Sequence, residues 1–309
     1  MTRQPVFIDC DPGLDDFIAI QAAFRVPHWE IAALGSVAGY LPVQKTTQNI
    51  AKAIQLAGSQ DIPFAAGAER PLAGQPVTVE SAHGKSGLGS VSLPASSCSP
   101  ISKDASQLLI EKAAEYEGAL MVVATGPLTN LARAFISCPA LPGMLRSVVF
   151  TGGGHAHGNI TPKAEFNIFA DPHAAHIVCT SGVDVTMVGL DAAMAAGWYG
   201  GQCTALCSSS DAGRAINTAL CDLRRFNAGL GLGDIAYIHG LTAVVCAAWP
   251  ELFNLVSCHV DIELKGRHTL GQTVCDLSGA GKKPSNANVA MGLDEEPYRA
   301  AIHRLLAGI

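Results

Sequence analysis

The chain has 309 residues, of which 49% are apolar and 15% are charged, a composition typical of folded globular proteins and not of disordered ones. A chain of this length buries roughly 75% of the surface that it would expose when unfolded, so we expect one domain with a full hydrophobic core over residues 1–309. The formal net charge of −6 argues against a basic nucleic-acid-binding surface and favours a small-molecule substrate.

The N-terminal segment does not look like a targeting signal, because Asp9 comes before any apolar stretch of signal-peptide length. No uninterrupted apolar run reaches the roughly 18 residues that a membrane-spanning helix needs. We therefore expect a cytoplasmic protein with no membrane partner. The ten cysteines include no Cys-x-x-Cys pair, and many lie in apolar strings, which predicts free, buried thiols.

Short apolar segments alternate with helix-like segments along the first two thirds of the chain. Six of them, rich in Val, Ile, Leu and Met, are predicted to be buried strands: Val6–Asp9, Ile31–Val37, Ile62–Ala66, Leu120–Thr125, Ser147–Thr151 and Asp184–Leu190. Helical periodicity predicts four intervening helices: Val43–Leu56, Lys103–Tyr116, Leu128–Phe135 and Pro172–Thr180. This alternation indicates an α/β fold with a mostly parallel central sheet, covered by helices on both faces.

The last third of the chain adds an amphipathic helix and three further elements. In Asp211–Phe226 the apolar side chains fall on one stripe, and Asp211 is able to cap the helix. The remaining expected elements are two strands and a closing helix, at Cys258–Leu264, Thr269–Leu277 and Glu295–Leu306.

Glycine-rich loops interrupt this pattern at His83–Gly89, Gly152–Gly154 and Gly229–Gly233. Open α/β sheets bind their ligands in the crevice outside the carboxyl ends of the strands, where such loops lie. We therefore expect these loops to border a ligand site.

Four carboxylates are crowded at the end of the first predicted strand. Asp9 and Asp11 alternate along the strand, and Asp15 and Asp16 follow within the first turn of the next predicted helix. Mutual repulsion requires that some of them hold protons or that a cation lies among them. A helix N-terminus capped by Asp9 and Asp11 is the simpler alternative. Because the set offers oxygen ligands without cysteine, it favours Ca²⁺ or Mg²⁺ over Zn²⁺.

Four segments of the chain together resemble the inosine–uridine nucleoside hydrolase family. They are FIDCDPGLDD (7–16), ATGPLTNLA (124–132), GGGHAHGNITPKAEFNIFADP (152–172) and HVDIELKGRHTLGQTVCD (259–276). The resemblance covers nearly the whole chain, and DxDPGxDD with a downstream EFN is its specific part. It implies a doubly wound α/β domain, usually assembled as a homodimer or homotetramer, that hydrolyses the N-glycosidic bond of a nucleoside.

The resemblance also implies a Ca²⁺ ion that holds the ribose hydroxyls and the attacking water. At the matching positions, Asp11 and Asp16 would be side-chain ligands and Thr125 would bind through its carbonyl oxygen. Asp11 would also act as the general base that deprotonates the water. Asp9 would not bind the ion itself but would support the residues that do.

The remaining site residues that the resemblance implies would contact the nucleoside. Asp15 would receive the ribose 2′-hydroxyl, and His239 would protonate the departing base. An imidazole with an ordinary pKa near ~6.5 is able to donate a proton at neutral pH. Glu165 and Asn167 are two positions apart, so an extended segment would point both toward the ribose. The other predicted substrate contacts are Asn159 to the ribose and His83 near the base.

The chain departs from the family's pattern at two of these positions. The family's last metal ligand is an Asp directly after the active-site His, whereas this chain has Gly240. Ca²⁺ accepts 6–8 oxygens and tolerates water as a substitute, so weaker binding is expected. The Asn that the family places after a Gly at the end of the second strand is Tyr40 here, and its phenol could fill part of the ribose pocket or donate a different hydrogen bond.

Two other functions compete with nucleoside hydrolysis. A paralogue that kept the pocket but lost or weakened turnover is favoured by Gly240. A phosphatase of the haloacid dehalogenase type also begins with DxD after an apolar strand, with Asp9 as nucleophile. The Pro-Gly-x-Asp-Asp continuation fits that class poorly.

Overall fold

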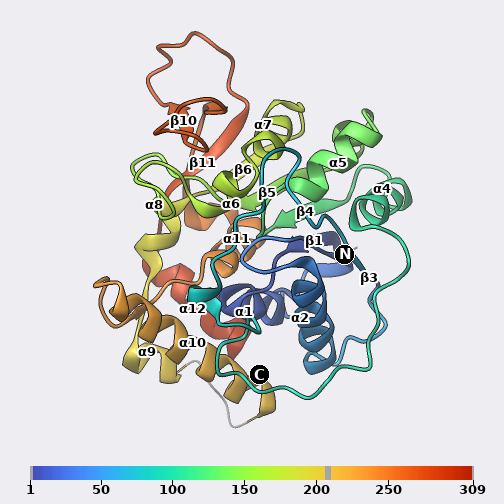
Figure 1. Cartoon of the computed structure of the whole chain (residues 1–309), viewed down its shortest axis with the longest axis vertical. Coiled ribbons are helices and arrows are strands. Elements are labelled where there is room, and N and C mark those ends of the chain that lie inside the picture. Colours follow the sequence, from blue (N-terminus) through green and yellow to red (C-terminus); the bar gives the residue numbers. More distant parts are fainter. Residues whose placement is uncertain (1–2, 206–209, 308–309) are drawn as a thin grey trace.

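The computed structural model describes residues 3–205 and 210–307, and its centre is a nine-stranded sheet (Figure 1). The strand order is β10-β9-β11-β6-β5-β4-β1-β2-β3. Neighbours from β11 to β3 pair in parallel, whereas β9 pairs antiparallel with both β11 and β10. The strands are β1 (Gln4–Cys10), β2 (Trp29–Ser36), β3 (Phe64–Ala66), β4 (Met121–Ala124), β5 (Ser147–Thr151), β6 (Val185–Val188), β9 (Phe253–Ile262), β10 (Thr273–Asp276) and β11 (Ala287–Leu293).

The helices of the described residues connect these strands and include several short turns. The longer ones are α1 (Leu14–Ala23), α2 (Val43–Leu56), α4 (Ala105–Glu115), α5 (Thr129–Ser137), α7 (Pro172–Thr180), α10 (Asp211–Gly229), α11 (His239–Ala248) and α12 (Glu295–Leu306). The shorter ones are α3 (Glu80–His83), α6 (Phe166–Ala170), α8 (Leu190–Ala193), α9 (Gly200–Ala205) and the 3₁₀ turns Leu141–Met144, Met194–Ala196 and Pro250–Leu252. A two-stranded sheet joins β7 (Trp198–Tyr199) to β8 (Ile235–Ala236).

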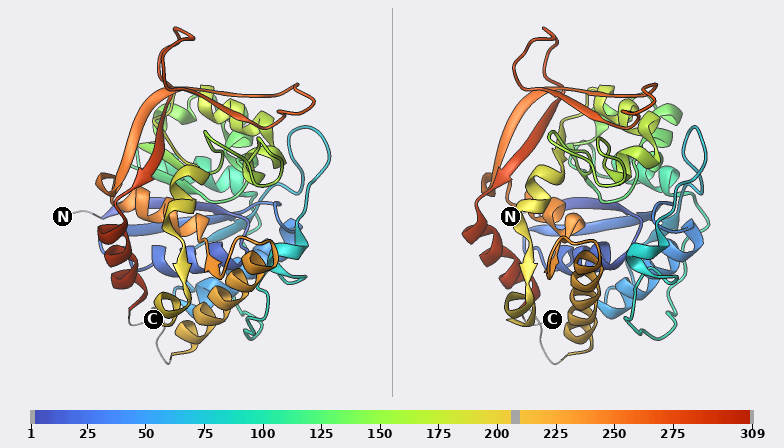
Figure 2. Two further views of the ribbon diagram at one scale, coloured as in Figure 1. Left: turned by 90° about the vertical axis from the view of Figure 1, so that its left-hand side faces the viewer. Right: turned by 60° about the vertical axis from the view of Figure 1, so that its left-hand side comes forward.

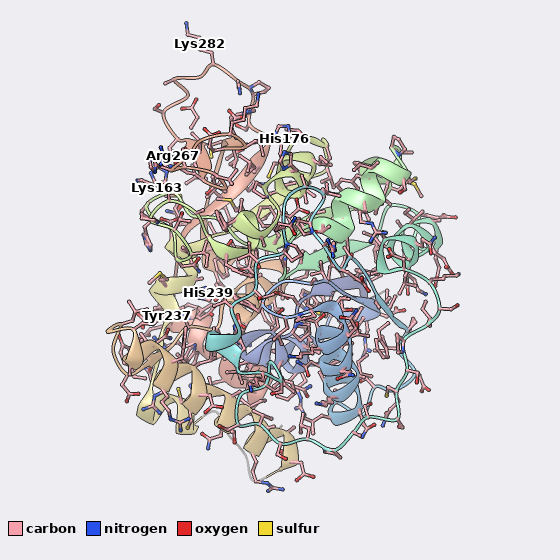
Figure 3. The ribbon with its side chains drawn as sticks, viewed as in Figure 1. Lys163, His176, Tyr237, His239, Arg267 and Lys282 are labelled. Atoms are coloured by element: carbon pink, nitrogen blue, oxygen red, sulfur yellow. The ribbon has the colours of Figure 1, made fainter. Side chains whose placement is uncertain are left out.

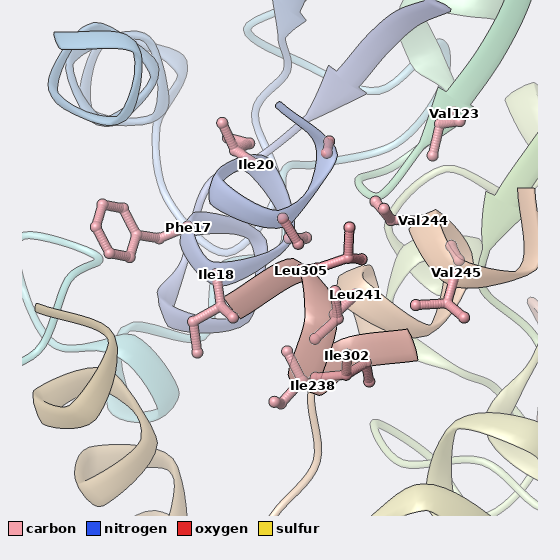
Figure 4. Packing of buried hydrophobic residues seen from close by; sticks show 14 of the residues in the cluster. Phe17, Ile18, Ile20, Val123, Ile238, Leu241, Val244, Val245, Ile302 and Leu305 are labelled. Carbon is pink, nitrogen blue, oxygen red and sulfur yellow. The ribbon is translucent and has the colours of Figure 1, made fainter. Parts of the chain in front are cut away.

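Two apolar cores lie on the two faces of the sheet, and β1 contributes to both. Val6 and Ile8 face the core that α1, α2, α10, α11 and α12 complete, part of which is seen in Figure 4. Phe7 faces the core built with α4, α5 and α7. In Figure 2 the strands β9 and β11 rise beyond this layered body and carry the loops around β10. Burial of β1 on both faces explains its continuous apolar sequence.

The parallel strands bring four chain segments to one edge of the sheet. β1, β2, β4 and β5 lie side by side, so the loops that follow Cys10, Ser36, Ala124 and Thr151 share the same edge. Backbone hydrogen bonds join these loops: the Val37 N–H donates to the Cys10 carbonyl at 3.0 Å. This carboxyl edge is where an α/β sheet binds ligands.

The predicted α/β class and mostly parallel sheet are confirmed, but several predicted elements differ. β10 is shorter than the predicted Thr269–Leu277, because residues 264–272 turn before the strand begins. Ser210, and not Asp211, caps α10, since its hydroxyl accepts from the Gly213 N–H at 2.9 Å. α11 and β11 were not predicted. Of the nine described cysteines all are free, and four are only half-buried; Cys207 lies outside the described residues.

None of the helices in the described residues is both long and apolar enough to cross a bilayer.

Candidate active site

Asp11 lies where β1 ends and the chain turns into α1. Its side chain is fully buried, and two loop backbones approach it at Gly39 and Gly126. A Cβ atom added at either glycine would lie less than 3.0 Å from an Asp11 carboxylate oxygen. The Tyr40 backbone N–H donates to Asp11 Oδ2 at 2.9 Å. Both loops therefore need glycine in order to enclose this carboxylate.

Asp15 and Asp16 occupy the first turn of α1, as predicted, and both are buried. The positive end of the helix dipole favours negative charge at this position. Thr125 directly follows β4 and is joined to β1 by a hydrogen bond from its N–H to the Asp9 carbonyl, at 2.8 Å. A Cβ atom added at Gly240 would lie less than 3.0 Å from Asp16 Oδ1 and 3.4 Å from the Thr125 Cβ. Gly240 is therefore a direct neighbour of two predicted metal ligands.

Asp9 points toward α5 and is held there by Asn130. The Asn130 amide donates to Asp9 Oδ1 at 2.8 Å and to the Ser36 carbonyl at 2.9 Å. Burial raises the pKa of Asp9 to about 7, although the hydrogen bond from Asn130 lowers it. Asn130 thus ties the ends of β1 and β2 together; it lies in the quoted segment 124–132, but this role was not predicted.

Glu165 and Asn167 do not lie in the extended segment that their spacing suggested. Glu165 caps α6, and its Oε2 accepts from the Gly153 N–H at 2.9 Å and the Ile168 N–H at 3.2 Å. Asn167 lies inside α6, and its amide donates to the Thr125 carbonyl at 2.9 Å. A short helix therefore presents both side chains at the carboxyl edge of the sheet. Asn159 in the preceding loop accepts from the Phe166 N–H at 2.9 Å through Oδ1.

Buried negative charge dominates the electrostatics of this group. Burial raises the pKa of Asp11 well above its ordinary value, and the charge of Asp16 raises it further. Burial and the charge of Asp15 do the same to Asp16. Burial also raises the pKa of Glu165 to about 7, against several backbone hydrogen bonds that lower it.

Several buried oxygens in this group lack a hydrogen-bond partner among the described residues. They are Asp11 Oδ1, Asp15 Oδ1, Asp16 Oδ2, Thr125 Oγ1 and Asn167 Oδ1. Unsatisfied, buried carboxylate and amide oxygens fit a hard divalent cation, which takes oxygen ligands. Across the described residues, no three His, Cys, Asp or Glu side chains are grouped as a metal site. Gly240 offers no carboxylate where the family pattern has one, so the oxygen set rests on two acidic ligands and the Thr125 carbonyl.

Two histidines face the acidic group from other elements. His83 Nδ1 accepts a hydrogen bond from the Leu14 N–H, at 3.0 Å, so the neutral ring carries its proton on Nε2. His239 begins α11, and its ring lies 6.2 Å from that of Tyr237. Burial lowers the pKa of both imidazoles, while the charge of Asp15 acts in the opposite direction. His239 is therefore less often protonated at neutral pH than an ordinary histidine.

The segment that carries His83 is fastened at further points. The Asn49 amide donates to the Ser86 carbonyl at 2.9 Å and to the Pro12 carbonyl at 3.0 Å. At the other end of the segment, the Ser90 N–H donates to Asp222 of α10 at 2.6 Å. Residues 83–90 are thus joined to α1, α2 and α10.

A cavity of about 420 Å³ opens beside these residues. Its polar lining includes Asp15, Tyr40, His83, Asn159 and His239. The rest of the lining is largely apolar and includes Leu190, Met194, Leu223, Phe226, Leu230 and Leu232. None of its lining residues in the described chain is Lys or Arg. Figure 3 places His239 with Tyr237, whereas Lys163, Arg267 and Lys282 lie toward β10.

The structure brings ten of the sequence-predicted site residues to this region, and it adds others. Phe166, Asn227 and Tyr237 line the cavity without having been predicted. Phe166 lies inside the quoted EFN motif, so that motif was the available signal. Asp234, the carboxylate nearest to Gly240 in the sequence, is exposed and pairs with Arg224, whose Nε lies 2.9 Å from Asp234 Oδ1.

Comparison with known proteins agrees with this geometry. The chain is 35% identical over 305 residues to the non-specific ribonucleoside hydrolase RihC of Escherichia coli (strain SMS-3-5), covering 99% of both chains. It superposes on a plant nucleoside hydrolase, PpNRh1, with a TM-score of 0.93 at 30% identity, covering 98% of this chain and 99% of the other. An inosine–guanosine nucleoside hydrolase gives a TM-score of 0.90 at 27% identity, covering 99% of both chains.

The family model for inosine-uridine preferring nucleoside hydrolase matches residues 6–300. This match spans both the acidic group and the histidines that face it. The chain therefore belongs to the inosine-uridine preferring nucleoside hydrolase family.

Proposed function

We propose that the protein hydrolyses the N-glycosidic bond of ribonucleosides to give ribose and a free base. The observation that carries this proposal is the set of buried, unpartnered oxygens on Asp11, Asp15 and Asp16, next to a cavity whose lining includes His83 and His239. Breaking this bond develops positive charge on the sugar, which nearby carboxylates stabilise. The departing base must gain a proton, which an imidazole on the other side is placed to give.

The cavity favours a neutral nucleoside over a nucleotide. Its described lining includes no Lys or Arg but does include Asp15. Three more carboxylates of the acidic group, those of Asp11, Asp16 and Glu165, are buried. A phosphate group would meet negative charge without a guanidinium or ammonium partner. We therefore expect nucleoside 5′-monophosphates to be rejected.

A divalent cation, Ca²⁺ by preference, fits the unpartnered oxygens. Asp11 and Asp16 would hold it through their carboxylates and Thr125 through its carbonyl oxygen. When bound, it would supply the positive charge that lowers the pKa of a neighbouring water. Asn167 already donates to the Thr125 carbonyl and leaves its own Oδ1 free, so it orients that carbonyl.

The chain's own groups then divide the remaining work. Asp11 takes the proton of the attacking water. The Tyr40 N–H and the glycine loops hold the Asp11 carboxylate in a fixed orientation. Asp15 receives the ribose 2′-hydroxyl, and Glu165, Asn159 and Asn167 hold the ribose. His239 gives its proton to the base, and His83 offers the base a donor, since its Nε2 carries the hydrogen.

A panel of nucleosides tests this proposal. We expect free base and ribose from inosine or uridine in the presence of Ca²⁺, and no release from the corresponding 5′-monophosphates. Asp11→Asn keeps the size of the side chain and removes the base, so it should lower turnover about 10²–10⁴-fold. Nucleoside binding without base release at millimolar substrate and Ca²⁺ would instead establish the inert paralogue that Gly240 favours.

We also propose a homodimer or homotetramer. Supporting this, the edge strand β10 and the turn after it expose Val274 (48%) and Leu277 (41%), and exposed apolar side chains at a sheet edge favour association. Light scattering at micromolar concentration would measure the mass, and a monomer would contradict this assignment.

A further inference from the structure

Tyr40 lies between two rings of the cavity wall. Its ring stacks on Phe166 with the centroids 4.2 Å apart and the planes 7° apart. The centroid of the His83 ring lies 4.3 Å from that of Tyr40, with the planes tilted by 52°. The backbone of Tyr40 is fixed, because its N–H donates to Asp11 Oδ2 and its carbonyl accepts from the Val79 N–H at 3.2 Å.

Only part of the buried acidic group reaches the cavity that this ring lines. Tyr40 and Asp15 line the cavity, whereas Asp11, Asp16 and Glu165 are not among its described lining residues. These three side chains are only 0%, 3% and 6% exposed. Burial raises the pKa of the Tyr40 phenol, and the charges of Asp15 and Glu165 raise it further.

The ring lies beside the route from the cavity to the rest of the site. A ribose in the cavity meets Asp15 directly, but contact with Asp11, Asp16 and Glu165 requires it to reach side chains that do not line the cavity. The Tyr40 backbone cannot move aside without breaking its hydrogen bond to Asp11. Its phenol makes no hydrogen bond in the described residues, so a rotation of the side chain would break only ring contacts.

We propose that Tyr40 is a gate that controls access to the acidic group. In the closed state described here the ring stacks on Phe166, and it rotates away from Phe166 when a cation and a ribosyl ligand enter. Tyr40 is thus a positioning and specificity residue for the reaction. This inference rests on the proposed function only for the identity of the sugar; the closure itself rests on the geometry.

Access to the acidic group is measurable with Ca²⁺ alone. Protein loaded with Ca²⁺ is mixed in a stopped-flow instrument with a fluorescent calcium chelator, and the equilibrium affinity is measured by calorimetry. Tyr40→Ala removes the ring and should speed both association and release about tenfold or more, with the equilibrium Kd changed less than about threefold. Tyr40→Phe keeps the ring and should behave like the parent.

Tyr116→Ala is the matched control, because it removes an equal ring far from the site, where the hydroxyl of Tyr116 bonds Glu30 at 2.9 Å. It should leave both rates unchanged. Equal release rates in the parent and Tyr40→Ala, or no binding by either, would overturn the gate. Binding of Ca²⁺ by Tyr40→Ala but not by the parent would also overturn the gate, because the ring would then block the site at equilibrium.

A crystal structure with Ca²⁺ and ribose gives an independent test. The ring of Tyr40 should be found away from Phe166, with the sugar in the vacated space. A ribose bound to Asp15 beneath an unmoved Tyr40–Phe166 stack would refute the inference. Altered Ca²⁺ kinetics without base release from any nucleoside would remove the proposed function and keep the gate, so the two failures are distinguishable.

Discussion

Two replacements of Gly240 distinguish the effect of filling the space beside Asp16 from the effect of restoring the carboxylate ligand that is missing there. Gly240→Ala adds a Cβ atom less than 3.0 Å from Asp16 Oδ1 and 3.3 Å from the Ala19 Cβ, so the buried Asp16 carboxylate must move. Overpacking of this kind costs about 1–3 kcal/mol, which corresponds to roughly a 5- to 150-fold loss if it falls on cation affinity. Gly→Ala near the start of α11 meanwhile favours the helix by about 1 kcal/mol.

Gly240→Asp adds the same Cβ atom together with a carboxylate. Its comparison with Gly240→Ala therefore measures the ligand alone, and we expect it to bind Ca²⁺ at least about tenfold more tightly than Gly240→Ala. Against the parent protein the gain should be smaller, because the displaced Asp16 offsets part of it. Calorimetric titration with Ca²⁺ measures all three affinities, and urea unfolding checks their stability. Parental affinity in Gly240→Ala, or equal affinities in the two variants, would refute this reasoning.

Three further results are expected. Ca²⁺ at 100 times its Kd should stabilise the protein by about 2.7 kcal/mol and raise Tm by about 4 °C in scanning calorimetry, and this shift should vanish with EDTA or in Asp16→Asn. His239→Ala should slow inosine hydrolysis about 10²–10⁴-fold yet spare 4-nitrophenyl riboside, whose leaving group needs no proton. Because the pKa of His239 is lowered, parental turnover of inosine should fall as pH rises through a value below the ordinary 6.5; a fall centred above 6.5 would contradict this. His83→Ala leaves the buried Leu14 N–H without an acceptor and should lower the free energy of unfolding by about 1–3 kcal/mol, whereas His83→Asn, which offers an oxygen in place of Nδ1, should retain most of it in a urea titration.

The sequence was most informative where periodicity and motif agreed. β1 is apolar on both faces, and its continuous apolar sequence therefore predicted a central strand. The carboxylates that follow it were expected at the carboxyl edge of the sheet. α11 was missed for a related reason. All its residues from Gly240 to Ala248 are buried, so it has no polar face and shows no helical periodicity.

Other features of the site depend on contacts between distant segments. Nothing in the sequence near His83 indicates that its ring bonds the Leu14 N–H, 69 residues earlier. The spacing of Glu165 and Asn167 suggested an extended segment, but the Glu165 side chain caps a helix that brings both residues to the edge. The departures at Tyr40 and Gly240 were visible in the sequence. Their consequences, the stacking of the Tyr40 ring on Phe166 and the closeness of the Asp16 carboxylate to Gly240, could be seen only in the fold.

The hydrogen bonds that hold residues 83–90 fix the distance between the His83 ring and the first turn of α1. Since His83 is bonded to the backbone of the helix that carries Asp15 and Asp16, and Asn49 holds the same two segments together, the imidazole and the acidic turn move as one body. With His83 at the base and Asp15 at the ribose, as proposed, the contacts to the two halves of the substrate keep a constant separation.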